Sequence, residues 1–491
     1  MTRTLLVLVF AWALLAIAAL PMTTQAAPVP QLNILPWLGL GGGNGKATKS
    51  AVSTTRPVTT TSKPTSTLKL ATVAAAATSP ITTASKAATT SIKASTTSSS
   101  TASLLSPTAP VTKLAASTGK IRGVNLGGWF ILENFLSPSV FSAAQQAGGS
   151  GASLPQDQWG FMTTINNNAK ALQILQQHWS SFIVESDFAQ IKSLGLNTVR
   201  IPVPHWAFTN SSSEPYLSGA ELPYIDQAVS LAAQYGLDVM LDMHTAPGSQ
   251  NGFDNSGHIG AINFGSSSDN ANRLYDALTA MVNRYVNDGK YGGAVKYVEI
   301  LNEPLCNVLG GDYVASVYQT AAARVNAAIS GSSRPQIVLH DCFATPLTNL
   351  GPFVSGSGPL AGTSFMIDTH RYHVFSPRQN LSFQQHVSLI KQDGDDIASA
   401  TSSLGRQVVT GEFSLAISCS DCPTGYSSTV TAADVAKLNR QFFETQTVAY
   451  DRGAGWIFFN WAAENNWPWS FKTSYNLNWI PQNILAQDEA L

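Results

Sequence analysis

The chain has 491 residues, of which 44% are hydrophobic and 12% charged, and its formal net charge is −1. The charge is uneven, because residues 27–120 carry nine Lys and Arg and no acidic residue, whereas residues 121–491 carry a net charge of −11. Such a length allows one large domain with added segments, and an acidic main body argues against nucleic acid as a partner.

The N-terminus has the pattern of a secretory signal peptide. Arg3 precedes an unbroken apolar run, Leu5–Leu20, and Thr24-Gln25-Ala26 offers small residues for cleavage. The run is short for a membrane span of roughly 20 residues. We expect residues 1–26 to be a signal peptide and the mature protein to be extracellular or in the cell wall, without a membrane span. The alternative is an uncleaved membrane anchor.

Residues 27–118 do not have the composition of a folded domain. Ser, Thr, Ala and Pro dominate, and no aromatic residue occurs between Trp37 and Trp129. Such a segment cannot bury enough apolar surface to offset its chain entropy. We predict a disordered, O-glycosylated stalk, with a bare flexible linker as the alternative. Its lysines favour weak attraction to anionic wall polymers, so wall association is an expectation.

Residues 119–491 are predicted to form one folded domain. Strand patterns alternate with helical ones such as Asp187–Leu194, Leu222–Tyr235 and Asn270–Asn287. The eight candidate strands are 121–126, 197–203, 237–244, 295–302, 336–341, 365–372, 407–413 and 455–461. This order predicts an α/β fold, a (β/α)₈ TIM barrel preceded by the disordered Ser/Thr-rich segment. A doubly wound open sheet is the alternative, but 123–128 lacks the spacing of its Gly-rich phosphate turn.

Polar or aromatic residues end six of the eight predicted strands, at the side where barrel enzymes place their active sites. They are Arg200, Asp242, His244, Asn302, Glu303, His370, Tyr372, Glu412 and Trp461. Each one alone has an ordinary structural explanation, such as an ion pair, a core histidine or a packed indole. Their occurrence together on one side of a barrel favours a functional cleft.

Glu303 and Glu412 each follow an apolar, β-branched run, so both carboxylates are expected at the ends of buried strands. Two carboxylates in one cleft are the working pair of a glycoside hydrolase. The acid needs a raised pKa, and the nucleophile needs cationic and hydrogen-bonding neighbours to stay ionised. Arg200 and Tyr372 are the neighbours expected to keep Glu412 ionised. Asn302 is expected to hydrogen-bond a sugar 2-hydroxyl, and Trp461 is expected to pack against the apolar face of a sugar.

The chain resembles glycoside hydrolase family 5, and closely its fungal exo-β-1,3-glucanases. The matching motifs are Gly123–Glu133, Val199–Pro202, Asp242–Gly257, Asn302-Glu303-Pro304, Asp368–Tyr372 and Gly411-Glu412. The resemblance implies a retaining double displacement with Glu303 as acid/base and Glu412 as nucleophile. It also implies a substrate pocket, with Phe253 and Phe375 as an aromatic clamp at its entrance. The pocket residues are Glu133, Arg200, His244, Asp254, Asn255, Asn302, His370, Tyr372 and Trp461, of which Glu133, Asp254 and Asn255 would bind the terminal glucose.

Some positions depart from the family pattern. Phe413 replaces the usual Trp after the nucleophile, Ala462-Ala463 replaces Lys-Thr, and the loop after Glu412 contains Cys419 and Cys422. We expect an exo-acting β-1,3-glucan hydrolase that releases glucose from non-reducing ends. The alternatives are an endo-β-1,6-glucanase, another β-glucan hydrolase or transglycosylase of the family, and a non-catalytic wall-binding protein.

The four cysteines predict two disulfides in a secreted protein. The sequence does not choose among three pairings, and we take Cys306–Cys342 with Cys419–Cys422 as a working guess. A lone CxxC without a histidine cluster does not favour a metal, and this chemistry needs neither metal nor cofactor. Sequons at Asn210 and Asn380 offer N-glycan sites. We expect a monomer whose partner is a β-glucan polysaccharide or oligosaccharide.

Overall fold

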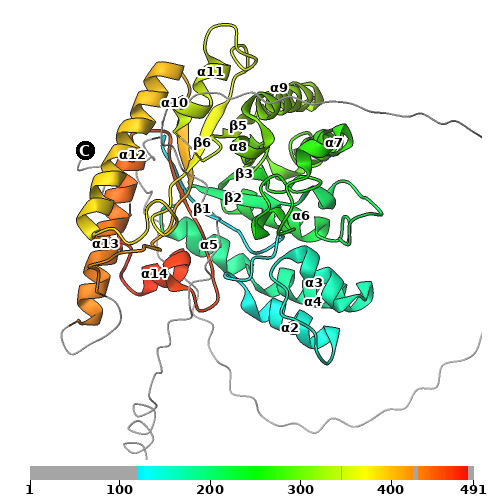
Figure 1. The fold of residues 1–491 in the computed structure, drawn as a ribbon, viewed down its shortest axis with the longest axis horizontal. Helices are drawn as coiled ribbons and strands as arrows, with labels where there is room; N and C mark the ends of the chain where they lie inside the picture. The colour runs from blue at the N-terminus through cyan, green and yellow to red at the C-terminus, as the bar shows by residue number, and fades with distance from the viewer. Residues whose placement is uncertain (1–118, 344, 424–429, 485–491) are drawn as a thin grey trace, which may run out of the picture. The chain divides into compact units, whose positions relative to one another are not determined.

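The computed structural model describes residues 119–343, 345–423 and 430–484, and the expected signal peptide and stalk lie outside them. Eight parallel strands form a closed barrel in sequence order, with β8 pairing back onto β1 (Figure 1). The strands are β1 Ile121–Asn125, β2 Thr198–Val203, β3 Asp238–Met243, β4 Val295–Glu299, β5 Gln336–His340, β6 Met366–His370, β7 Val408–Glu412 and β8 Gly455–Phe458. Barrel closure confirms the predicted (β/α)₈ fold and excludes the open sheet.

The helices surround this barrel, and all three helices expected from the sequence form, within two residues of their predicted ends. The α-helices are α2 Pro138–Gly148, α3 Gln158–Ile165, α4 Asn168–Ser181, α5 Glu185–Ser193, α6 Leu222–Gln234, α7 Ser268–Tyr285, α8 Cys306–Leu309, α9 Gly311–Ala328, α10 Pro346–Asn349, α11 Gly351–Val354, α12 Phe383–Leu404, α13 Ala432–Tyr450 and α14 Phe471–Asn476. Short 3₁₀ turns are η1 His205–Ala207, η2 Asp254–Ser256, η3 Phe264–Ser266, η4 Gly289–Tyr291 and η5 Trp467–Trp469. No helix in the described ranges has both the length and the hydropathy to cross a bilayer.

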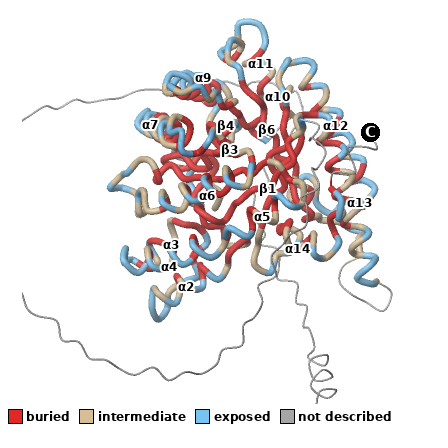
Figure 2. The backbone as a smooth tube through the Cα atoms, turned by 180° about the vertical axis from the view of Figure 1, so that it is seen from behind, coloured by how far each residue is buried: buried red, intermediate tan, exposed pale blue. Residues whose placement is uncertain are grey.

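Burial follows the expected layers. The strands at the centre are buried, and the helices turn one buried face inward and one exposed face outward (Figure 2). In α7 the buried positions include Leu274, Leu278 and Met281, which recur at the spacing of one helix face. The apolar stripe therefore fixes how each helix sits against the barrel.

The inside of the barrel changes from apolar to polar along the strands. Met240 of β3 and Met366 of β6 belong to a buried apolar cluster with residues of β1, β5, β7 and β8. Two residues further along the same strands, and so on the same face, stand Asp242 and Asp368, which are fully buried. A hydrophobic plug thus supports a layer of charged groups near the carboxyl ends of the strands.

Two disulfides are present in the described residues. Cys306 pairs with Cys342, which joins the loop after β4 to the loop after β5, and Cys419 pairs with Cys422 in the loop after β7. This agrees with the working pairing taken from the sequence.

Candidate active site

Arg200 organises the charged layer. It is fully buried on β2, and its Nε lies 2.8 Å from Glu299 Oε2, its Nη1 2.8 Å from Glu412 Oε1 and its Nη2 2.8 Å from Asn302 Oδ1. Burial alone would lower the pKa of Arg200, but the surrounding carboxylates raise that pKa well above its ordinary value. The guanidinium is therefore a permanent positive charge that holds Glu412 and Asn302 in place.

Glu412 ends β7 and is held from two sides. Arg200 donates to Oε1, and the Tyr372 hydroxyl donates to Oε2 at 2.7 Å. The preceding Gly411 donates its backbone N–H to Asp368 Oδ1 at 2.7 Å, and a Cβ at position 411 would lie 2.0 Å from Asp368 Oδ2. Only glycine fits there, so the Gly411-Glu412 pair of the sequence has a steric cause.

Glu303 lies four residues beyond the end of β4, and its backbone has a φ of 48°, which a non-glycine residue adopts at some cost. Its Oε1 is 2.6 Å from His370 Nδ1, and its Oε2 accepts from Asn255 Nδ2 at 2.7 Å. The same His370 Nδ1 is 3.4 Å from Glu412 Oε2. Those two carboxylate oxygens are thus no farther apart than the sum of the two distances, so the carboxyl groups lie close enough to act on one sugar.

The two pKa shifts in the free protein run opposite to the expectation from the sequence. Burial raises the pKa of Glu303, but the hydrogen bond and charge of His370 outweigh it and leave that pKa below its ordinary value. Burial also raises the pKa of Glu412, and here the nearby His370 and Arg200 do not outweigh it. His370 itself has a raised pKa despite burial, because Glu412 and Asp368 stabilise its charged form. The directions of the two pKa shifts favour a protonated His370 beside an ionised Glu303.

Other predicted pocket residues face the same cleft. Burial, followed by the charges of Asp254, Glu412 and Glu303, raises the pKa of Glu133. Burial raises the pKa of Asp254 to about 6. One carboxylate oxygen of Glu133, Oε1, is buried without a hydrogen-bond partner in the described part of the chain. Glu133 and Asp254 are thus near enough to Glu303 for its charge to raise their pKa values.

His244 directly follows β3, and Asn302 follows β4 by three residues. Asn302 donates toward His244 Nε2 at 3.5 Å, and His244 Nδ1 contacts Asp242. Gln250 donates to the carbonyls of both His244 and Asn302, at 2.9 and 3.0 Å. The loop after β3 and the loop after β4 are therefore fastened together below Glu303.

The aromatic residues divide into separate groups. Trp461 is fully buried, and its Nε1 donates to Asp187 Oδ1 at 3.0 Å. Phe375 packs with Tyr372 and Trp469, at ring-centroid distances of 5.6 and 6.3 Å. The ring of Phe253 instead lies 6.3 Å from that of Phe343, a residue that the sequence reasoning did not single out. Phe253 and Phe375, the two predicted clamp residues, therefore pack against different aromatic neighbours.

The sequence reasoning also missed Glu299 and His340. Glu299 is the buried partner of Arg200, and its signal was a charged residue inside the apolar run Val298-Glu299-Ile300. The ring of His340 lies 4.4 Å from that of His370, and it ends β5 as His370 ends β6. A titratable residue within or at the end of an apolar run was the available sign for both.

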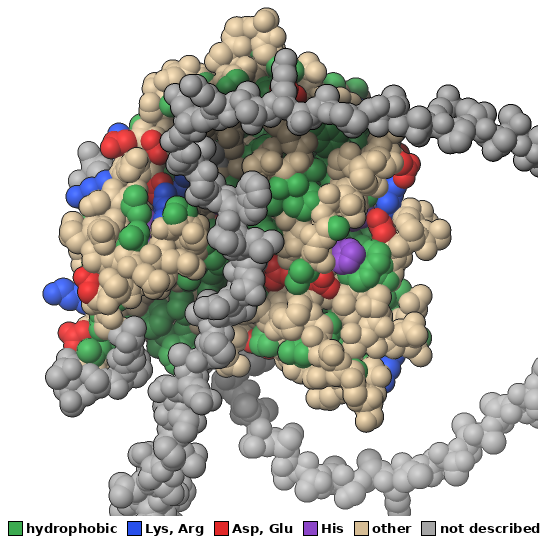
Figure 3. Space-filling view, viewed as in Figure 1, with side chains coloured by type: hydrophobic (Ala, Val, Ile, Leu, Met, Phe, Trp, Pro, Cys, Tyr) green, Lys and Arg blue, Asp and Glu red, His purple; other side chains and the backbone are tan. Residues whose placement is uncertain are grey.

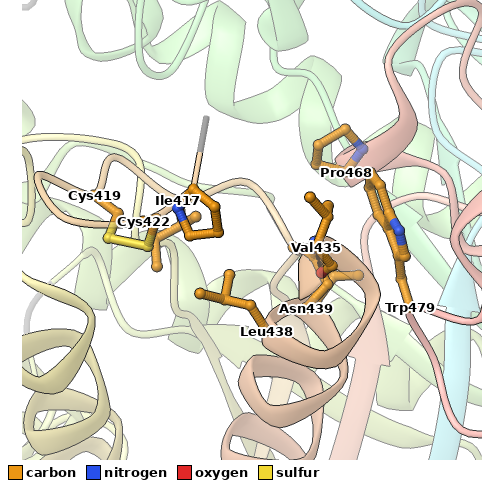
Figure 4. Close-up of a pocket in the computed structure, with 10 residues that line it drawn as sticks. Ile417, Cys419, Cys422, Val435, Leu438, Asn439, Pro468 and Trp479 are labelled. Atoms are coloured by element: carbon orange, nitrogen blue, oxygen red, sulfur yellow. Dashed lines mark hydrogen bonds between the residues drawn. A yellow bond between two sulfur atoms is a disulfide. The ribbon is translucent and has the colours of Figure 1, made fainter. Parts of the chain in front are cut away.

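The surface carries hollows besides the carboxylate cleft. Acidic side chains are visible together near the middle of one face, next to hydrophobic ones, while Lys and Arg lie toward its edge (Figure 3). A separate, largely apolar groove of about 200 Å³ lies beside the Cys419–Cys422 disulfide, lined also by Leu438, Pro468 and Trp479 (Figure 4). Neither catalytic glutamate candidate lines this groove.

Comparison with known proteins identifies the family. The family model described as Cellulase (glycosyl hydrolase family 5) matches residues 163–465. Glucan 1,3-beta-glucosidase 1 of Schizosaccharomyces pombe is 35% identical over 362 residues, covering 71% of this chain and 84% of the relative. Glucan 1,3-beta-glucosidase 2 of Wickerhamomyces anomalus is 36% identical over 389 residues, covering 72% and 86%. The chain belongs to glycosyl hydrolase family 5.

Solved structures agree with the family 5 assignment at the level of the fold. The crystal structure of rutinosidase from Aspergillus niger has a TM-score of 0.60 and 19% identity, covering 75% of this chain and 97% of that one. The crystal structure of AoRut has a TM-score of 0.60 and 18% identity, covering 74% and 97%. The family model and the relatives confirm the resemblance seen in the sequence motifs, and the protein is a glycoside hydrolase.

Proposed function

We propose that this family 5 hydrolase is a retaining β-glucan hydrolase that acts from non-reducing ends of β-1,3-glucan and releases glucose. The observation that carries the proposal is the pair of buried carboxylates, Glu303 and Glu412, that share one nitrogen of His370 at 2.6 and 3.4 Å. The relatives named glucan 1,3-beta-glucosidase support the substrate and the bond.

In the first step, Glu412 attacks the anomeric carbon, and the bond from that carbon to the glycosidic oxygen breaks. The leaving oxygen takes a proton from Glu303, and glucose remains as an ester on Glu412. Glu303 gains this proton from His370 Nδ1 along the 2.6 Å hydrogen bond. A sugar bound between the carboxylates displaces water and disfavours charge on Glu303, which drives the transfer.

In the second step, water attacks the same carbon. Glu303 accepts a proton from the water, the ester bond breaks, and Glu412 leaves as a carboxylate. Arg200 and Tyr372 stabilise the returning negative charge through their hydrogen bonds to its two oxygens. The configuration at the anomeric carbon is retained because it is inverted twice.

Glu133, Asp254 and Asn255 supply acceptors and donors for the hydroxyls of a terminal glucose. Asn255 links this group to the acid, because its Nδ2 donates to Glu303 Oε2. The unpartnered oxygen of Glu133 is a free acceptor at a buried position, which a sugar hydroxyl would satisfy. Binding a chain end in this way supports exo action.

The proposal extends to location and organisation. The signal pattern at 1–26 supports secretion, and the basic Ser/Thr-rich segment 27–118 supports attachment of the catalytic domain, 119–491, to a wall. Deleting 27–118 is expected to leave activity on soluble glucan intact and to reduce retention on isolated walls. Loss of soluble activity would contradict a role in attachment alone.

The test is a product time course on laminarin with the wild-type protein and Glu412→Gln. Glucose is expected as the sole early product, with a loss on the order of 10⁴-fold or more in the variant, while circular dichroism confirms that the variant is folded. Early oligosaccharides would contradict exo action, and a faster reaction on pustulan would contradict the β-1,3 preference. An α-anomer as the first product, read by NMR, would refute retention.

A further inference from the structure

The Cys306–Cys342 disulfide spans the rim of the active site. Cys306 stands three residues after Glu303 and begins α8, and Cys342 stands two residues after the end of β5. Its sulfurs join segments that are 36 residues apart in sequence. The bridge therefore links the loop that carries the acid/base candidate to the loop that carries Phe343.

Phe343 is held in an exposed position by its neighbours. Its side chain is 43% exposed, although it is large and apolar. The backbone is left-handed at both Cys342 and Phe343, with φ of 62° and 66°, a conformation that is unfavourable for a non-glycine residue and persists only where surrounding contacts hold it. The contacts that fix it are hydrogen bonds from Phe343 N to Asp341 Oδ1 at 3.1 Å and from Asn349 Nδ2 to the Cys342 carbonyl at 3.1 Å, together with the disulfide.

A short series of ring contacts connects Phe343 to the reacting groups. Its ring lies 5.2 Å from that of His340, which lies 4.4 Å from that of His370, and His370 contacts Glu303. On its other side, Phe343 lies 6.3 Å from Phe253, which is followed in sequence by the pocket residues Asp254 and Asn255. The Phe253–Phe343 pair therefore borders the Glu303 side of the cleft.

The chemistry defines what lies on that side. An acid that protonates the glycosidic oxygen must stand beside the sugar that leaves, and in the second step it stands beside the group that attacks. Sugar rings present an apolar face that packs on exposed aromatic rings, and a rigid aromatic pair loses little entropy on binding. The Phe253–Phe343 pair is placed to bind the leaving or accepting sugar, not the terminal glucose.

We propose that the Cys306–Cys342 disulfide positions the part of the cleft that binds the leaving sugar. It does so because it holds the Phe343 ring next to the Phe253 ring and in a fixed position relative to Glu303. The inference rests on the proposed function. Opening the bridge frees the β5 loop to leave its left-handed conformation, which withdraws the phenyl ring from the cleft. The terminal-glucose pocket, formed by other strands, keeps its geometry.

The experiment compares the double variant Cys306→Ala/Cys342→Ala with Cys419→Ala/Cys422→Ala, which removes the other disulfide, beside the separate groove (Figure 4). Each protein is given β-glucosyl fluoride, whose leaving group contacts no aromatic wall, and the glycosyl-enzyme is partitioned between laminaribiose and methanol as acceptors. Both acceptors need Glu303 as the base, but only laminaribiose needs the wall. Their ratio therefore isolates the wall from the acid/base.

The laminaribiose-to-methanol transfer ratio is expected to fall about tenfold in Cys306→Ala/Cys342→Ala, which corresponds to about 1.4 kcal/mol, and to stay within twofold in the control. Phe343→Ala, with the bridge intact, should produce the same fall. Adding Phe343→Ala to the double cysteine variant should produce little more, because both changes remove one shared interaction.

Three results would overturn the inference. They are an unchanged ratio in a folded Cys306→Ala/Cys342→Ala variant, an equal fall in the control variant, and full additivity with Phe343→Ala. If the double cysteine variant does not fold, Phe343→Ala together with mild reduction of the wild-type protein decides the question. Absence of glucosyl transfer or fluoride hydrolysis in the wild-type protein would instead refute the proposed function.

Discussion

The surroundings of Glu412 and Glu303 differ in kind. Glu412 ends a strand and is held by Arg200 and Tyr372, an arginine inside the barrel and a tyrosine hydroxyl. Glu303 lies beyond its strand with a left-handed backbone, and its partners are a histidine and an amide. The surroundings of Glu412 fix the position of its carboxylate, whereas those of Glu303 allow its carboxylate to exchange a proton with His370.

The difference matches the roles proposed for the two carboxylates in a double displacement. A nucleophile must return to the same charged state after every cycle, so fixed donors and a permanent cation serve it. An acid/base must change protonation twice per cycle, so a neighbour that also titrates is useful. His370, with its raised pKa, is that neighbour.

Among variants that distinguish the surroundings of Glu303 from those of Glu412, Glu303→Gln is expected to have the largest effect on activity. Laminarin hydrolysis should fall about 10³-fold, within the roughly 10²–10⁴-fold contribution of general acid–base catalysis. Ester formation from β-glucosyl fluoride should be much less affected, because fluoride leaves without a proton. The measurement is a pre-steady-state burst of fluoride with that substrate. Equal losses on both substrates would assign Glu303 a different role.

A smaller effect with a distinctive pH signature is expected from His370→Gln. Because the pKa of His370 is raised, the wild-type site stays protonated at pH values above the ordinary histidine pKa of about 6.5. Because the pKa of Glu303 is lowered, the imidazole is the group that holds this proton. Without the imidazolium, Glu303 must hold the proton itself. The alkaline limb of the kcat/KM profile should therefore move to lower pH, with activity at the optimum reduced about 10²-fold.

The control for this profile is Tyr372→Phe, which leaves His370 and Glu303 in contact and should keep the alkaline limb in place. A limb that stays fixed in His370→Gln, or that moves to higher pH, would contradict the assignment of the proton to His370.

The smallest effect is expected from Tyr372→Phe itself. The change removes one hydrogen bond to a charged oxygen of Glu412, worth about 1.5–3 kcal/mol, and leaves Arg200 on the other oxygen. We expect kcat to fall about 10- to 100-fold, with ester formation and ester hydrolysis both slowed. A matched change on the other side, Asn255→Ala, should affect KM as well, since Asn255 is also proposed to contact the sugar. Identical kinetic patterns for both variants would remove the distinction between the two settings.

Much of the architecture could be predicted from the sequence because it depends on periodicity. An apolar run such as Val408–Glu412 gives a strand buried on both faces, and the alternation with helices gives parallel pairing and barrel closure. Placing Arg200, Glu303 and Glu412 at one end of that barrel follows from the direction of the strands. The sequence by itself therefore determined the fold, the family and the candidate catalytic pair.

The tertiary structure decided what depends on distances between segments far apart in the chain. Glu299, His340 and Phe343 joined the site only because β2, β4, β5 and β6 bring them to Arg200, His370 and Phe253. The direction of the Glu303 pKa shift was decided in the same way, since a 2.6 Å contact between residues 67 apart lowers a pKa that was expected to be raised. Electrostatic energies depend on separation and burial, and neither can be read from the order of residues.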